Sequence, residues 1–383
     1  MKAMNFSLSK EQQSIVKAAR KFAKGEFVDR AREFDKEETF DLAIWEKACE
    51  LGFVGVFIEE AYGGAGYGFF EHCLITEEFW AVEPGVAMAV LSCTFGAELL
   101  ALFGTEEQKQ AVLPRLAAGE AILGTAITEP DAGSDPSMAE LTAVKEDGHW
   151  VLNGTKMFAT GGTIAQYMLV FCKTDPDNPS RHKRHSFILV PTGTPGYKAN
   201  KIHGKLGIRA SDTAEVVLSN VQVPADSLVG GRGTGFTQLM AFFNRTRLHI
   251  CAQAVGLARA ALEEAIRHVK GRVQFGCRLA DFQATQFKIA EMATRIRASR
   301  NLYYEAAWLA DQGKLDHSLV AMAKWYAAKT AVYCADEALQ MHGGYGYIDE
   351  YKVQRLYRDA KILEIYEGAK EIEKTIIARS LLN

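Results

Sequence analysis

The sequence lacks the patterns of metal-binding, disulfide-bonded and membrane-spanning proteins. Its seven cysteines include no CxxC pair, and no histidines show an HExxH or similar metal-ligand spacing. An odd number of widely spaced cysteines is typical of reduced thiols in a reducing compartment. No apolar run approaches the ~20 residues needed to span a bilayer, and no signal-peptide pattern opens the chain. We therefore expect a cytoplasmic protein with no metal ion and no membrane span.

The chain also lacks a strong net charge. Its 44 basic and 47 acidic residues leave a formal charge of −3, which gives no electrostatic reason to expect a nucleic-acid partner. The hydrophobic share of 48% and the charged share of 24% are ordinary for a globular protein. At 383 residues the chain is too long for one small core, and we expect two or three packed parts.

Hydrophobic periodicity divides the chain into three regions. Residues 1–120 have helical spacing, with capping boxes predicted at Ser9 and Thr105, each followed three residues later by Gln. Residues 121–230 contain short alternating stretches, and Asp147-Gly148 and Asn153-Gly154 predict hairpin turns there. Residues 231–383 return to long amphipathic helices at about 236–269, 281–311 and 316–341. We therefore predict an α+β fold with an N-terminal helical domain, a middle antiparallel β-barrel-like domain and a C-terminal bundle of long helices.

Local motifs make this outline specific. In chain order they are ITEPDAGSD (127–135), NGTKMFAT (153–160), KLGIRAS (205–211), NRTR (244–247) with RVQFG (272–276), and YRDAKILEIYEG (357–368). Their order and intervals resemble the acyl-CoA dehydrogenase family over the whole chain. The resemblance implies that family's fold, an FAD cofactor and oxidation of an acyl-CoA thioester to the trans-2-enoyl-CoA, in fatty acid or carboxylic acid degradation.

The first two motifs resemble the family's flavin-binding segments. Small side chains let the backbone approach a ligand, and hydroxyls can satisfy a buried polar ring. The resemblance implies that Ser134 touches the FAD pyrophosphate or the CoA arm, and that Phe158 stands where relatives place a Trp near the flavin. Thr160 matches the residue that bonds flavin N5, and the residues implied to face the isoalloxazine are Thr125, Ile127 and Thr128.

A further set resembles the residues that contact the FAD of a neighbouring subunit. Arg272 matches the arginine that binds the FAD pyrophosphate, and a planar guanidinium can donate two parallel bonds to a diphosphate. The other members of this set are Phe275, Gln283, Gln340, Gly343 and Gly344. The resemblance therefore implies a homo-oligomer, with a tetramer as the family default.

The last motif resembles the catalytic segment. Glu367 matches the base that takes the α-proton, while the β-hydrogen leaves as hydride to flavin N5. Gly368 lets the backbone turn, and the Glu367 N–H would help to hold the thioester carbonyl. Arg247 matches an arginine near this carboxylate, and Asn244 stands where many members have an Asp that contacts the CoA chain. An electron-transfer flavoprotein is the implied electron acceptor.

The acyl group is predicted from residues 85–100, which resemble the helix at the far end of the pocket. Residues 85–96 contain no Lys or Arg, which counts against a dicarboxyl substrate. Leu91 and Phe95 favour a closed apolar pocket of modest depth and therefore a short, branched or cyclic acyl chain.

Three alternatives remain open. The same fold could serve an oxidase or monooxygenase, a non-catalytic CoA- or flavin-binding protein, or a helical scaffold without a cofactor. An intact Glu367 favours the dehydrogenase, and the flavin-type motifs argue against a scaffold. One departure is Ala369, where most relatives have a Thr near the FAD.

Overall fold

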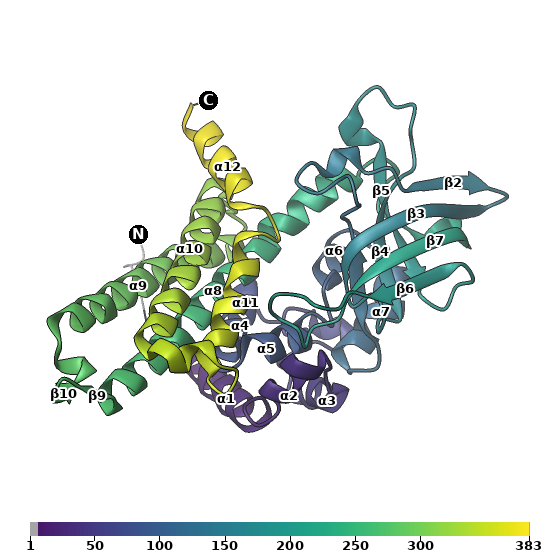
Figure 1. Ribbon diagram of the computed structural model, residues 1–383. Helices are drawn as coiled ribbons and strands as arrows, with labels where there is room; N and C mark the ends of the chain where they lie inside the picture. The colour runs from purple at the N-terminus through teal and green to yellow at the C-terminus, as the bar shows by residue number, and fades with distance from the viewer. Residues whose placement is uncertain (1–6, 383) are drawn as a thin grey trace.

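The computed structural model describes residues 7–382 and confirms the predicted α+β fold class. Figure 1 shows helices at the N-terminal end, a β-sheet on one side and long helices on the other. The N-terminal helices are α1 (Lys10–Glu26), α2 (Ala31–Glu37), α3 (Leu42–Glu50), α4 (Phe69–Trp80), α5 (Pro84–Leu91), α6 (Ala97–Phe103) and α7 (Glu106–Ala117).

Both predicted capping boxes form. The Gln12 backbone N–H donates to Ser9 Oγ at 3.1 Å, and the Ser9 N–H donates to the Gln12 side chain at 2.9 Å. Thr105 and Gln108 make the same pair of bonds at the start of α7. These reciprocal bonds satisfy N–H groups that a helix start leaves open, which is why so local a signal predicts the helix start well.

The middle region forms one eight-stranded sheet in the order β6-β7-β3-β1-β4-β5-β8, with β2 paired to β3 and β4. Its strands are β1 (Leu123–Ala126), β2 (Thr142–Glu146), β3 (His149–Thr160), β4 (Tyr167–Lys173), β5 (His185–Pro191), β6 (Tyr197–Lys201), β7 (Thr213–Pro224) and β8 (Leu228–Val229). Most pairs are antiparallel, but β1 and β4 are parallel. The sequence of β1 shows no alternation of polar and apolar residues that would predict a strand, because all four of its residues are buried.

One predicted turn is correct and one is wrong. Asp147 and Gly148 form the β2–β3 turn with positive φ angles of 45° and 81°. Asn153-Gly154 instead lies inside β3, at a shift of register against β7. Gly154 has φ 142°, and a Cβ there would come within 2.9 Å of the Leu141 Cα. This glycine therefore serves a bulge and a close backbone approach, not a hairpin.

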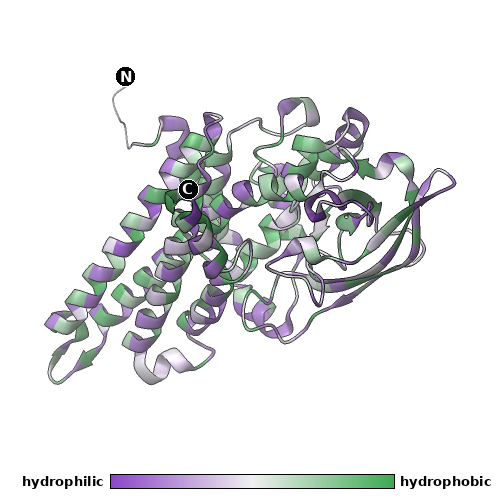
Figure 2. Ribbon diagram, turned by 90° about the horizontal axis from the view of Figure 1, so that it is seen from above, coloured by the Kyte–Doolittle hydropathy of each residue, from purple (hydrophilic) through white to green (hydrophobic). Residues whose placement is uncertain are grey.

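The predicted long helices are α8 (Gly235–Gly271), α9 (Gln283–Asp311) and α10 (His317–His342), followed by α11 (Lys352–Ala360) and α12 (Lys370–Leu382). The short strands β9 (Val273–Gln274) and β10 (Cys277–Arg278) connect α8 to α9. In Figure 1, α8 runs from the bundle towards the sheet, and in Figure 2 polar and apolar bands alternate along the long helices. Single 3₁₀ turns are η1 (Glu60–Tyr62), η2 (Pro136–Met138), η3 (Arg181–Lys183), η4 (Ala225–Ser227), η5 (Leu279–Asp281), η6 (Gly343–Tyr347) and η7 (Lys361–Glu364).

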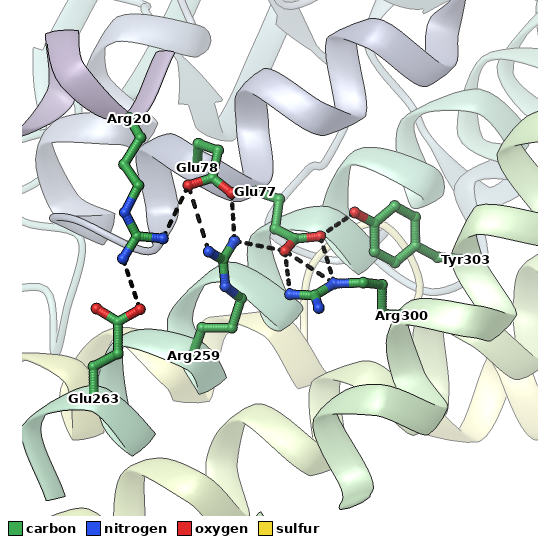
Figure 3. A network of polar contacts seen from close by, with 7 residues as sticks. All are labelled: Arg20, Glu77, Glu78, Arg259, Glu263, Arg300 and Tyr303. Atoms are coloured by element: carbon green, nitrogen blue, oxygen red, sulfur yellow. Dashed lines mark hydrogen bonds and ion pairs between the residues drawn. The ribbon is translucent and has the colours of Figure 1, made fainter. Parts of the chain in front are cut away.

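A buried ion network joins the N-terminal helices to the bundle (Figure 3). Glu77 of α4 accepts bonds from Arg259 of α8 and Arg300 of α9, each at 2.6 Å, and from the Tyr303 hydroxyl. Burial raises the pKa of Glu77, but the charges of Arg300 and Arg259 outweigh it and the net pKa lies below the usual value. Arg20 extends the network from α1 to Glu78 and Glu263. Four helices are thereby fixed to one another.

The KLGIRAS motif joins the sheet to the bundle. The Ile208 N–H donates to the Asp359 carboxylate of α11 at 2.6 Å, and Arg358 donates to the Leu206 carbonyl at 2.9 Å. A Cβ at Gly207 would come within 2.6 Å of the Arg358 carbonyl group. Arg209 bonds the Lys205 carbonyl of its own loop. The motif is therefore a contact between two parts of the fold.

Within residues 7–382, no helix has both the length and the apolarity needed to cross a bilayer. All seven cysteines are unpaired, and six of them are buried.

We expect Glu77→Gln to lower the free energy of unfolding by about 3 kcal/mol, because it leaves two half-buried guanidinium groups without a full counter-charge. Urea unfolding followed by circular dichroism measures this. The matched control is Glu263→Gln, an exposed member of the same network, for which we expect less than about 1 kcal/mol. Equal losses in the two variants would contradict the central place of Glu77.

Candidate active site

The Glu367 carboxyl lies on a strained turn between η7 and α12. Glu367 has φ 54° and Gly368 has φ 108°. A left-handed conformation costs a non-glycine residue about 1–2 kcal/mol, so the surroundings must hold it. A Cβ at Gly368 would come within 2.1 Å of the Glu373 carboxylate, so only glycine fits this position.

Helix α8 holds the turn from one side. The Thr246 hydroxyl donates to Glu367 Oε2 at 2.5 Å, and Arg247 Nε donates to the Glu367 carbonyl at 3.0 Å. Arg247 Nη1 donates to Asn244 Oδ1 at 3.1 Å. The structure therefore brings together four residues that the sequence placed at the catalytic centre: Asn244, Arg247, Glu367 and Gly368.

The Glu367 carboxyl is suited to hold a proton. Burial raises its pKa, while the Thr246 hydrogen bond and the charges of Arg247 and Lys324 lower it by less. The net pKa is above the usual glutamate value, so the group accepts a proton more readily than a solvated carboxylate.

The two motifs predicted to bind flavin meet in the sheet. Thr125 of β1 and Thr160 of β3 are direct cross-strand partners. The Thr125 hydroxyl donates to the Phe95 carbonyl at 2.8 Å, and the Met157 N–H donates to the Thr128 carbonyl at 2.8 Å. Ile127 is half-buried and Ser134 is exposed on the following loop.

The Phe158 ring is open to a large partner. Its side chain is 62% exposed and its φ is 59°, so the strand end presents an aromatic face in a strained conformation. An exposed ring of this size next to hydroxyls fits a planar cofactor that is apolar on its faces and polar at its edge.

A buried ion pair, which the sequence reasoning missed, holds these motifs together. Lys156 Nζ lies 2.7 Å from Glu129 Oε1 and donates to the Ile127 carbonyl at 2.9 Å. Glu129 also accepts from the N–H groups of Glu140 and Leu141. Glu129 belongs to the motif at residues 127–135 and Lys156 to the motif at residues 153–160. The sequence signal for their pairing was therefore one charged residue inside each motif.

The region predicted to line the acyl pocket differs from the expectation in two ways. Residues 85–100 do not form one helix, because a turn with Gly96 at φ 114° separates α5 from α6. Leu91 and Phe95 are half-buried, and the Phe95 ring packs 5.2 Å from that of Phe242. The second difference is a buried carboxyl, Glu98, just after this turn.

Glu98 belongs to a polar cluster beside the apolar residues. Burial raises its pKa to about 7, and the negative charge of Glu367 adds to this rise. His249 Nδ1 lies 3.9 Å from Glu98 Oε1, and the rings of His249 and His72 are 3.9 Å apart. The sequence reasoning missed this cluster because its members come from α4, α6 and α8.

A second candidate site lies at the C-terminal end of α8. A surface pocket of about 470 Å³ is lined by residues that include Arg272, Gln340, Gly343 and Gly344. A Cβ at either glycine would meet nothing within 4 Å, so the backbone there is open to a ligand. The pocket is ~37 Å along the helix from Arg247 at 1.5 Å per residue.

Phe275 and Gln283 do not line this pocket in their own chain. Phe275 is 94% exposed at the β9–β10 turn with φ 54°, and Gln283 is exposed at the start of α9. Both side chains are therefore available to a neighbouring molecule.

Comparisons with known proteins cover the whole chain. Residues 9–120, 124–221 and 233–382 match the N-terminal, middle and C-terminal domains of acyl-CoA dehydrogenase. Acryloyl-CoA reductase (NADH) of Anaerotignum propionicum is 40% identical over 384 aligned residues, covering 100% of this chain and 97% of that protein.

Solved structures agree with this assignment. Butyryl-CoA dehydrogenase of Megasphaera elsdenii superposes with a TM-score of 0.95 at 37% identity, covering 99% of this chain and 100% of that one. A chain in a structure described as the electron transferring flavoprotein of Acidaminococcus fermentans gives 0.96 at 37% identity, with coverage of 99% and 100%. Glutaryl-CoA dehydrogenase of Mycobacterium smegmatis in complex with FADH2 gives 0.92 at 30% identity, with coverage of 98% and 95%. Together with the catalytic turn and the paired motifs, these matches establish that the chain belongs to the acyl-CoA dehydrogenase family of FAD-dependent enzymes.

Proposed function

We propose that Glu367 is the base that removes the α-proton of an acyl-CoA thioester in α,β-dehydrogenation. The observation that carries the proposal is a buried carboxyl of raised pKa on a turn that Thr246 and Arg247 hold in place. A carboxyl that is fixed in position can be aligned with one C–H bond of the substrate, and such alignment lowers the barrier to proton transfer. The Glu367 N–H is the proposed donor to the thioester carbonyl, where negative charge develops.

FAD supplies the hydride acceptor when it is bound. The residues proposed to hold its ring are Thr125, Ile127, Thr128, Phe158 and Thr160, which lie at the adjoining ends of β1 and β3 and on the loop that follows β1. The exposed Phe158 face and the neighbouring hydroxyls support this fit.

The proposed contacts of the CoA thioester are Ser134, Asn244, Arg247 and Gly368. Arg181 lies 3.4 Å from Asp135 and adds a cation beside Ser134.

We propose a short, branched or cyclic acyl group. The Phe95 ring packs on Phe242, and the Phe95 carbonyl accepts a bond from Thr125, one of the proposed flavin contacts. Leu91 ends the helix just before Phe95. These apolar side chains support a shallow apolar space. Helix α5 carries no Lys or Arg that could bind a distal carboxylate.

A panel of acyl-CoAs mixed anaerobically with the enzyme tests the proposed acyl group by the bleaching of oxidised flavin. Fastest bleaching by palmitoyl-CoA would contradict it.

We also propose that the enzyme is a homo-oligomer, a tetramer by resemblance, in which the Arg272 pocket receives the FAD of a neighbouring chain. Its distance from the catalytic turn along α8 and the exposure of Phe275 support this arrangement. An electron-transfer flavoprotein is the proposed acceptor. An oxidase is the second candidate, and peroxide released during turnover in air would favour it.

We expect Glu367→Gln to slow flavin bleaching by about 10²–10⁴-fold, because an amide cannot accept the α-proton. The exposed Glu371→Gln is the control and should leave the rate unchanged. In the unmodified enzyme the raised pKa of Glu367 means that the rate falls as pH drops through that value, since only the ionised base reacts. A Gln variant with the full rate would exclude Glu367 as the base.

We expect Arg272→Ala to weaken FAD binding by about 10–100-fold, the scale of a hydrogen bond to a charged group. Flavin retained after gel filtration measures the loss, and sedimentation reports the oligomer in the same sample. Arg267→Ala, on the same helix and paired with Glu264, is the matched control. Full flavin retention by Arg272→Ala would argue that the pocket does not hold FAD.

A further inference from the structure

Three charged side chains are buried against the turn formed by Glu367 and Gly368, here called the catalytic turn. Arg247 comes from α8, Lys324 from α10 and Glu373 from α12. Lys324 is 1% exposed and Glu373 is 0% exposed. Charges are rarely buried so completely unless other groups compensate them.

The two cations hold consecutive carbonyls of the turn. Arg247 Nε donates to the Glu367 carbonyl at 3.0 Å, and Lys324 Nζ donates to the Gly368 carbonyl at 2.5 Å. These bonds fix Glu367 and Gly368, whose positive φ angles set the direction of the Glu367 side chain. Removal of either cation would free one side of a strained backbone.

Glu373 is the remaining anion of this group. Its Oε1 lies 3.1 Å from Arg247 Nε, and its carboxylate packs against Gly368 so closely that no side chain fits there. Apart from this contact with Arg247, neither oxygen has a hydrogen-bond partner within the described part of the chain. Glu373 therefore acts on the turn through its charge and its position.

We propose that Glu373 and Lys324 are positioning residues of opposite sign that fix the catalytic turn and set the proton affinity of Glu367. The proposal rests on the proposed role of Glu367 as the base. When Glu367 and Glu373 are both ionised, the two cations balance the two carboxylates. Loss of one partner therefore changes both the geometry of the turn and the charge that the base experiences.

Ionisable groups from α8, α10 and the turn face Glu373, and the Glu98 carboxyl of α6 interacts with the charge of Glu367. Arg247 and Cys251 face it from α8, Lys324 from α10 and Glu367 from the turn. Burial raises the pKa of Glu373 to about 7, which Arg247 and Lys324 oppose and Glu367 reinforces. Burial lowers the pKa of Lys324 to about 8, against the attraction of Glu373 and Glu367.

The signs of the two effects differ. In the pH range where Glu373 is ionised, a neutral residue at position 373 removes a like charge and leaves both cations facing Glu367, so the pKa of Glu367 falls. A neutral residue at position 324 removes a cation, so the pKa of Glu367 rises. A purely structural role would not shift the two variants in opposite directions.

The test is the pH dependence of the flavin-bleaching rate in the FAD-loaded enzyme, measured by rapid anaerobic mixing with a substrate that the native enzyme oxidises. We expect Glu373→Gln to move the acid-side midpoint down by about one pH unit and Lys324→Met to move it up by a similar amount. Both should lower the limiting rate about tenfold, because the turn is looser. Glu373→Asp keeps the charge and should keep the midpoint near that of the native enzyme.

The controls are the exposed Glu371→Gln and Lys329→Met on the same two helices, which should leave the midpoint unchanged. The double variant Glu373→Gln/Lys324→Met restores the charge balance and should return the midpoint towards the native value. If Glu373→Gln does not fold, Lys324→Met and Glu373→Asp still carry the test. Unshifted midpoints, or shifts in the same direction, would overturn the proposal.

A failure of the proposed function is distinguishable. In that case Glu367→Gln bleaches at the native rate, or no acyl-CoA reduces the native enzyme. A failure of this inference alone leaves Glu367 essential while the acid-side midpoint does not respond to residues 324 and 373.

Discussion

The close packing of α8 against α4 is the constraint on which the rest of the structure depends. Gly256 lets the helices approach so closely that a Cβ there would come within 2.5 Å of the Glu77 carbonyl. Three residues on, Arg259 bonds the Glu77 carboxylate. Because α8 is continuous, this contact also places Arg247 at the Glu367–Gly368 turn and Arg272 at the distal pocket. One helix thereby sets the geometry of two candidate sites.

The Glu367–Gly368 turn combines backbone strain with buried charge. A glutamate at φ 54° and a carboxyl in a water-poor site are each unfavourable alone. Arg247 offsets both, because one guanidinium bonds the backbone of the turn and attracts the carboxyls around it. Thr246 adds a hydroxyl to the Glu367 carboxylate without adding charge. The pKa of Glu367 can therefore stay raised while its position stays fixed.

Sequence reasoning succeeded where the signal was local. The capping boxes at Ser9 and Thr105, the Asp147-Gly148 turn and the long helices each depend on residues a few positions apart. It failed at β1, whose buried residues show no alternation, and at Gly154, whose role depends on Leu141. The motifs named Glu367 and Arg247, which the structure brings into contact. Lys324, Glu373 and Glu98 stayed unassigned because their partners lie on other helices. Spacing along a chain carries no information about such pairs.

The motifs therefore contain residues of two kinds. Thr160 and Glu367 lie at the candidate site, whereas the Lys156–Glu129 pair and Asp359 hold the backbone near it. The second kind is charged but does not face the site. Burial raises the pKa of Asp359 to about 7, against the hydrogen bond from the Ile208 N–H, so its contact with the sheet domain is made at a cost in desolvation. The contact fixes the loop at residues 205–211 against α11, the helix that precedes the Glu367–Gly368 turn. The polar residues within these motifs thus serve alignment as much as chemistry.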